Sequence, residues 1–490
     1  MTISNDSDSV AKFRRAEGQI EEHSVELRRE LGLMDLVLTQ ILFIVGLGWV
    51  GAAAKLGSSH IIFWLLAIIL FYIPSAAVVI YLNRLMPLEG GLYQWAKLGL
   101  GERTGFMTAW NLWLFVVLLT SEIGLQAATI LSYALGPKAA WMPTSKWFVT
   151  ASCCVLIGGL VIVSLLGLNV GKWLHNAGGL VMLITFAALI VLPILDLSPG
   201  TIRQYHPFAV SLPTVSLFSL NILGKLGFAA LGGFEYVAIL AGECRNPERA
   251  IGRSVLIAAP VIAIMFILGT SAVLAFVHPD EINLIAPIPQ VLSLGSRPFR
   301  IAGQVMPFAI LIILGIRVAQ ASVNFTANSR LPMVAGWDRL LPQWFTRLHP
   351  RYRTPVNSIL LIGTLTLLLG LIGLIGVGPQ EAFQLLQSAA VIFYAVAYLV
   401  MFTLPIVGLK GVEPRPPVWL KVAALSGFLM TLLNVVLSVF PIVKVESRVS
   451  FAAKIMTVII VSNLIGASIF AAAGRNRRNT RAEAITSSAE

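Results

Sequence analysis

The sequence is short of charge. Only 12% of its 490 residues are Asp, Glu, Lys or Arg, whereas soluble globular proteins carry roughly 25%. The same chain is 57% hydrophobic, with a mean hydropathy of +0.84. A soluble fold has too little interior to bury so much apolar surface. The composition therefore predicts a protein that crosses the membrane many times.

The sequence also lacks the motifs of common enzymes and metal sites. It contains no HExxH, GxSxG or CxxC pattern, and no two of its six histidines have metal-ligand spacing. Its three cysteines supply no disulfide framework, so we interpret them as small apolar side chains. The net charge of +12 is spread over loops and tails, which argues against nucleic-acid binding. We expect no enzyme activity, no cofactor, no metal and no nucleic-acid partner.

What the sequence does contain is a series of long apolar runs. A helix needs about 20 apolar residues to cross a bilayer, and runs of this kind predict about twelve spans in an all-α protein. They lie near 33–56, 61–83, 104–135, 147–167, 172–195, 214–242, 253–277, 300–327, 355–376, 383–409, 417–440 and 452–473. The short, half-polar segment 92–100 predicts a helix at the membrane surface.

Lys and Arg concentrate in alternate loops. If the N-terminus is cytoplasmic, the inner segments carry roughly three times as many of these residues as the outer loops. Residues 1–32 lack the apolar core of a signal peptide and read as a tail, with a short amphipathic helix around 11–31. Residues 474–490 form a second basic tail. We therefore expect a multi-pass protein of the cell (inner) membrane with both tails in the cytoplasm.

Two glycine breaks interrupt otherwise apolar, membrane-length runs. One is Gly46-Leu47-Gly48, and the other is Gly232-Gly233. Hydrocarbon cannot satisfy the backbone groups that such breaks free, so the breaks must line a cavity or bind a ligand. One Gly-x-Gly alone more often marks close helix packing. A second break at the matching place favours a binding site between them.

The positions of the breaks also predict the domain organisation. Each broken run opens a set of five spans, which is typical of transporters built from inverted repeats. The sequence therefore predicts two five-helix repeats followed by two peripheral helices. These parts cover residues 33–195, 214–409 and 417–473.

Three segments resemble the amino acid–polyamine–organocation (APC) superfamily. Residues 224–254, with the pattern G-F-E, A-G-E and R-N-P-E-R-A-I, resemble its sixth helix and the loop that follows. Residues 87–113, "PLEGGLYQWAKLGLGERTGFMTAWNLW", resemble its loop between helices 2 and 3. Residues 328–355, "NSRLPMVAGWDRLLPQWFTRLHPRYRTP", resemble its loop after helix 8. The three segments occur in the family's order, and the resemblance covers roughly residues 33–440.

The resemblance implies a leucine-transporter-type fold with an amino acid bound where helices 1 and 6 unwind. The implied substrate-binding residues are Val45, Gly46, Leu47, Gly48, Thr120, Ile123, Ala229, Ala230, Leu231, Gly232, Gly233 and Asn324. Two features depart from the family. Ala229, with Phe228 beside it, stands where some members have a gating aromatic residue. No basic residue lies between Gly178 and Leu195, where some proton-coupled members carry a lysine.

Four charged residues lie within predicted spans, namely Glu122, Lys225, Glu235 and Arg317. Charges at membrane depth are costly and are therefore candidates for coupling or gating. We expect Glu122 and Lys225 to pair across an outer vestibule, or Lys225 to titrate; the alternative is a static ion pair. Glu235 would anchor the second break or serve as a proton site.

Arg317 has two interpretations. Its fixed charge would stand in for the sodium ion that related folds hold between helices 1 and 8, so that sodium is not required. Alternatively, it would be a structural partner of backbone carbonyls or of Glu122.

Together these features predict a secondary transporter of amino acids or related amines that works by alternating access. Proton coupling is favoured over sodium coupling. The alternatives are an exchanger of an amino acid against an amine, and a membrane receptor that keeps the fold without transport.

Overall fold

The structure is a computed structural model. It describes residues 29–195, 202–203, 205–208, 210–295, 302–372, 379–407, 415–442 and 447–487, together with Gly18 and Glu22. The amphipathic helix expected around 11–31 lies almost wholly outside these residues. Within them the chain is helical, and its only extended pairing consists of two isolated β-bridges. The all-helical fold class is confirmed.

The helices are joined by short connections. In chain order the α-helices are α2 (Leu33–Ile44), α3 (Trp49–Ala54), α4 (His60–Ala67), α5 (Ile73–Leu85), α6 (Leu92–Leu100), α7 (Glu102–Ser121), α8 (Ile123–Leu135), α9 (Lys146–Leu166), α10 (Leu168–Leu195), α11 (Leu217–Gly224), α12 (Pro247–Phe276), α13 (Pro287–Gly295), α14 (Ala302–Asn328), α15 (Arg330–Trp337), α16 (Val356–Ile372), α17 (Pro379–Val407), α18 (Val418–Ser438) and α19 (Arg448–Ser487). Short 3₁₀ segments are η1 (Gly57–Ser59), η3 (Pro137–Ala139), η4 (Met142–Thr144), η6 (Phe234–Glu243), η7 (Pro279–Glu281) and η8 (Gln343–Thr346), and π segments are η2 (Ile68–Tyr72) and η5 (Lys225–Ala230).

The length and composition of these helices fit a bilayer. Ten helical segments of the described chain are long and apolar enough to cross a membrane, and α2 and α16 are shorter apolar helices. Large apolar side chains on the outer helices point away from the protein, such as Val155 and Leu464, which are 73% and 62% exposed. Water would penalise this exposure, whereas lipid does not. The protein is therefore a multi-pass membrane protein, and the total of twelve spans stays a prediction.

Both predicted breaks are present. Helix α2 ends at Ile44, and the chain runs through Val45 before α3 begins at Trp49. Helix α11 begins with a capping box in which the Ser216 side chain accepts from the Ser219 N–H, and it passes into the π turn η5. The chain then leaves the helix before η6 begins. Gly233 has φ +138°, a conformation that glycine adopts far more readily than other residues.

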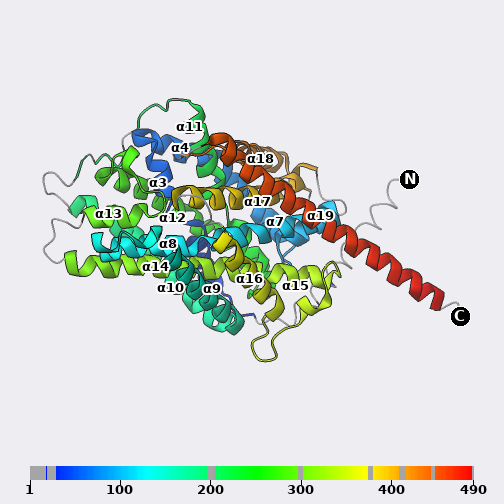
Figure 1. Ribbon diagram of the computed structural model, residues 1–490. Coiled ribbons are helices and arrows are strands. Elements are labelled where there is room, and N and C mark those ends of the chain that lie inside the picture. The colour runs from blue at the N-terminus through cyan, green and yellow to red at the C-terminus, as the bar shows by residue number, and fades with distance from the viewer. Residues whose placement is uncertain are drawn as a thin grey trace.

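Helices that are distant in the sequence pack together in the bundle. Helices α7 and α17 pack side by side through its middle, and α12 packs against α2 (Figure 1). Helix α19 packs against α7 and α17 and then extends beyond the bundle toward the C-terminus (Figure 1). Because α19 continues to Ser487, most of the tail expected at 474–490 is helical. The division into two five-helix repeats stays a prediction.

Candidate functional site

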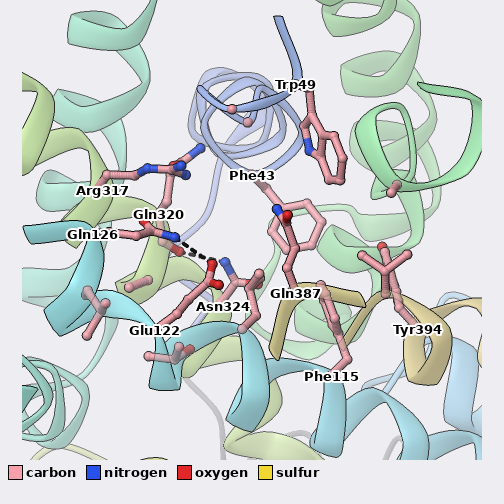
Figure 2. Close-up of a pocket in the computed structure, with 18 of the residues that line it drawn as sticks. Phe43, Trp49, Phe115, Glu122, Gln126, Arg317, Gln320, Asn324, Gln387 and Tyr394 are labelled. Atoms are coloured by element: carbon pink, nitrogen blue, oxygen red, sulfur yellow. Dashed lines mark hydrogen bonds between the residues drawn. The ribbon is translucent and has the colours of Figure 1, made fainter. Parts of the chain in front are cut away.

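A cavity lies between the two breaks. Its volume is about 100 Å³, and its walls come from the α2–α3 break, α7, α8, the η5–η6 break, α14 and α17 (Figure 2). Nine predicted residues line it: Gly46, Gly48, Thr120, Glu122, Ile123, Ala229, Gly232, Arg317 and Asn324. The other predicted residues do not line it: Val45, Leu47, Lys225, Phe228, Ala230, Leu231, Gly233 and Glu235. The segments that the glycines interrupt therefore meet around one small space.

The first break is held open by a glutamine. The last turn of a helix leaves carbonyl groups without partners. The Gln320 side-chain amide donates to the carbonyl oxygens of Leu42 and Val45, at 2.7 and 2.8 Å. Arg317 Nη1 in turn donates to Gln320 Oε1 at 2.9 Å, which fixes the orientation of the amide. Gln320, on α14, therefore acts as a clamp, because it donates hydrogen bonds to these two carbonyl groups at the end of α2.

The clamp bears on both interpretations of Arg317. Its guanidinium reaches the end of α2 through Gln320, and its role in place of a sodium ion stays a prediction. Arg317 also faces Glu122 across the cavity closely enough for the two charges to attract, although they are not in ion-pair contact (Figure 2). Of the roles considered for Arg317, that of a partner of Glu122 has this geometric support.

The second break is anchored to α17. The Gly233 N–H donates to the Tyr398 hydroxyl at 2.7 Å, and that hydroxyl donates to the Glu235 carboxylate. The Tyr394 hydroxyl donates to the other Glu235 oxygen at 2.5 Å. Glu235 is fully buried, so these two phenols replace water as its hydrogen-bond donors. The geometry supports the anchoring role that the sequence suggested for Glu235.

Aromatic rings close around this anchor. Tyr394 lines the cavity and stacks on Phe115, with ring centres 4.2 Å apart. Phe228 packs edge-on against Phe71 and Tyr398 and is fully buried behind the cavity wall. Ala229, its neighbour, reaches the cavity instead. The aromatic residues at the wall thus come from α2, α3, α7 and α17, and not from the position before the second break.

The expected pairing of Glu122 with Lys225 is wrong. Glu122 Oε1 accepts from Gln126 at 2.5 Å, and its Oε2 is buried with no hydrogen-bond partner among the described residues (Figure 2). Lys225 Nζ instead lies 3.5 Å from Ser438 Oγ on α18. Lys225 at the start of η5 therefore lies toward α18, whereas Glu122 bonds to α8. Titration of Lys225 stays a prediction.

Comparison with known proteins identifies the family. The sequence model of the amino acid permease family matches residues 31–465. The chain belongs to this family. An uncharacterized transporter of Legionella pneumophila is 26% identical over 80% of this chain and 83% of its own length. A branched-chain amino acid permease of Bacillus subtilis is 22% identical over 75% and 81%, and a probable agmatine/putrescine antiporter of Lactococcus lactis is 20% identical over 82% and 84%.

The resemblance to the APC superfamily is confirmed, and the three segments that carried it meet in this permease. Glu89, from 87–113, accepts from the Gly242 N–H at 2.7 Å. Arg330, from 328–355, forms a buried ion pair with Glu243 at 2.8 Å. Burial, with the nearby Glu243 charge, raises the pKa of Glu89 well above its ordinary value. Segments far apart in the sequence therefore form one polar cluster beside η6.

Sequence reasoning missed the neutral polar residues of the permease cavity. Gln126, Gln320 and Gln387 all line it, and none carries the charge that made the other candidates conspicuous. A signal was present, because Arg317, Gln320 and Asn324 are spaced by three and four residues. That spacing places them on one face of a helix.

Proposed function

We propose that this permease is a secondary active transporter of amino acids or related amines that works by alternating access. The observation that carries the proposal is that both helix breaks line one cavity with an acidic, a basic and several amide side chains. In this conformation the cavity is small, about 100 Å³, so a bound substrate would fill it closely. The transporter would lie in the inner membrane with both termini in the cytoplasm, as the distribution of Lys and Arg suggests.

The broken backbone is proposed to hold the head of the substrate. The amides at Leu47 and Gly48 would donate to its carboxylate, and carbonyl groups of the breaks would accept from its amine. The side chain of the substrate would then extend toward Gln126, Asn324 and Tyr394. A substrate that fills this space would link α2 and η6, the elements that alternating access requires to move.

Proton coupling is proposed in place of sodium coupling. The Gln320 amide already donates to Leu42 and Val45, so these carbonyl groups have a partner without a cation. Glu122 lines the cavity, and one of its oxygens has no hydrogen-bond partner in the part of the chain that the structure describes; this oxygen is our candidate for the site that takes up a proton. Exchange is the second candidate, because one relative is named as an antiporter.

The test is transport by the purified protein in proteoliposomes. We expect uptake of a labelled amino acid or amine driven by an inward proton gradient, unchanged when sodium is replaced by choline. Glu122→Gln should lower proton-driven uptake by roughly tenfold or more, since charges at such sites are functional, and should retain counterflow. Exposed Glu281→Gln is the control.

The remaining outcomes separate the alternatives. Counterflow with no net uptake would favour the exchanger. Binding of a substrate with neither net uptake nor counterflow would contradict transport and favour a receptor. Uptake that depends on sodium would contradict the coupling proposal alone.

A further inference from the structure

A second and larger cavity opens in the side of the bundle. Its volume is about 310 Å³, at the lower end of the range of roughly 300–1,000 Å³ for small-molecule sites. It lies between α7, α15, η8, α16 and α19, and its walls consist of aliphatic and aromatic residues, including Phe106, Trp110, Trp113, Phe345 and Leu365. None of its lining residues lines the substrate cavity.

The mouth of this lateral cavity faces lipid. Two of the helices that form it carry exposed apolar side chains beside it, with Leu368 on α16 48% exposed and Leu464 on α19 62% exposed. Ala109 and Ala335 line the cavity, and their small side chains leave the space open. In a multi-pass membrane protein, such a recess receives its occupant from the bilayer.

Two arginines lie close in sequence to residues that line the cavity. Arg103 precedes the lining residue Phe106 by one helical turn, and Arg347 follows the lining residue Phe345 by two positions. Both arginines are exposed. Trp344 stacks on Phe345 with ring centres 4.1 Å apart and is 44% exposed, which is typical of a tryptophan at headgroup level. The elements that form the apolar recess therefore carry exposed positive charge next to residues that line it.

We propose that the lateral cavity binds one acyl chain of an anionic phospholipid, whose headgroup lies against Arg103 and Arg347. In a bilayer, an acyl chain gains little free energy when it leaves other lipids to contact apolar side chains. Close packing therefore holds the acyl chain in the cavity, and the charge of the headgroup gives selectivity. At about 310 Å³, the recess has room for one acyl chain. A partner's transmembrane helix, about 10–12 Å across, would be too large for this volume.

The test is native mass spectrometry of the detergent-purified protein titrated with phosphatidylglycerol or phosphatidylcholine of identical chains. We expect preferential binding of one phosphatidylglycerol. Ala335→Phe should fill the cavity and reduce this binding at least tenfold. Arg103→Gln and Arg347→Gln should each reduce it about fivefold and leave phosphatidylcholine unaffected.

Two control variants match these changes at distant sites. Ala151→Phe adds the same ring to an exposed position of α9, and Arg448→Gln removes a charge at the opposite end of α19; both should bind as the unchanged protein does. If Ala335→Phe does not fold, Ala109→Leu fills the facing wall instead. Equal binding of phosphatidylglycerol and phosphatidylcholine would overturn the proposal. An equal loss of phosphatidylglycerol binding in Ala335→Phe and Ala151→Phe would also overturn it. Occupation by a free fatty acid or a second copy of the chain would also overturn it.

Discussion

At the scale of single residues, neutral side chains hydrogen-bond to the charged ones and orient them. Gln320 connects Arg317 to the carbonyl groups at the end of α2, and Gln126 binds Glu122. A buried carbonyl group that loses its donor costs about 1–3 kcal/mol. Gln320 satisfies two such groups at once, so we regard it as the residue that holds the first break in its cavity-lining form.

Replacing Gln320 should therefore damage binding. Gln320→Leu removes the donor to Leu42 and Val45, and we expect substrate affinity to fall by about tenfold or more. Equilibrium binding of a labelled substrate measures this. The matched control is Gln290→Leu. Gln290 also bonds backbone groups, at Asn283 and Glu281, but it lies outside the cavity. Wild-type affinity in Gln320→Leu would show that the clamp is dispensable.

At the scale of elements, each break depends on a neighbour that is distant in sequence. Helix α14 clamps the first break and α17 anchors the second. Phe43, from the last turn of α2, packs directly against Gly233, and its ring stacks on Tyr236 with centres 3.9 Å apart. The two broken segments therefore contact each other, so a change in the conformation of one alters the packing of the other.

Gly233 is the position where this contact is most restrictive. A Cβ at Gly233 would lie 2.6 Å from the Phe43 ring, and the φ of +138° strains any L side chain. We expect Gly233→Ala to lower the thermal unfolding temperature by about 5 °C or more and to abolish substrate binding. Gly252→Ala is the control, since its Cβ would meet Ile80 at an ordinary 3.7 Å in a regular helix. Equal stability of the two variants would contradict the argument.

At the scale of the whole molecule, the distribution of charge predicts orientation. Lys138 lies in the segment between α8 and α9, and Lys421 lies near the start of α18. The excess of basic residues places the first in an outer loop and the second on the cytoplasmic side. Both side chains are exposed, so both can be tested by labelling.

Cysteine labelling of cells that produce the protein checks this orientation. In a Cys154→Ser background, which removes the exposed native thiol, Lys138→Cys should react with a membrane-impermeant maleimide in intact cells. Lys421→Cys should react only after permeabilisation. The reverse pattern would contradict the orientation, and labelling of both positions in intact cells would contradict the span count between them.

The sequence by itself determined the membrane class, the helical fold and the two breaks. These properties follow from run length, apolar composition and glycine, all of which act within about one helix. The family was also evident, because its motifs are contiguous segments. The partners of the candidate residues were decided only by tertiary structure.

The physical reason is that spans of nearly uniform hydrophobicity do not reveal which face of a helix meets which neighbour. Glu235 and Tyr398 are separated by 163 positions, and Gln320 and Leu42 by 278. Lys225 was expected to face Glu122, yet it lies at the start of η5 with its side chain near Ser438 on α18. Helix packing determined these partners, and it arises from many weak contacts across the whole bundle.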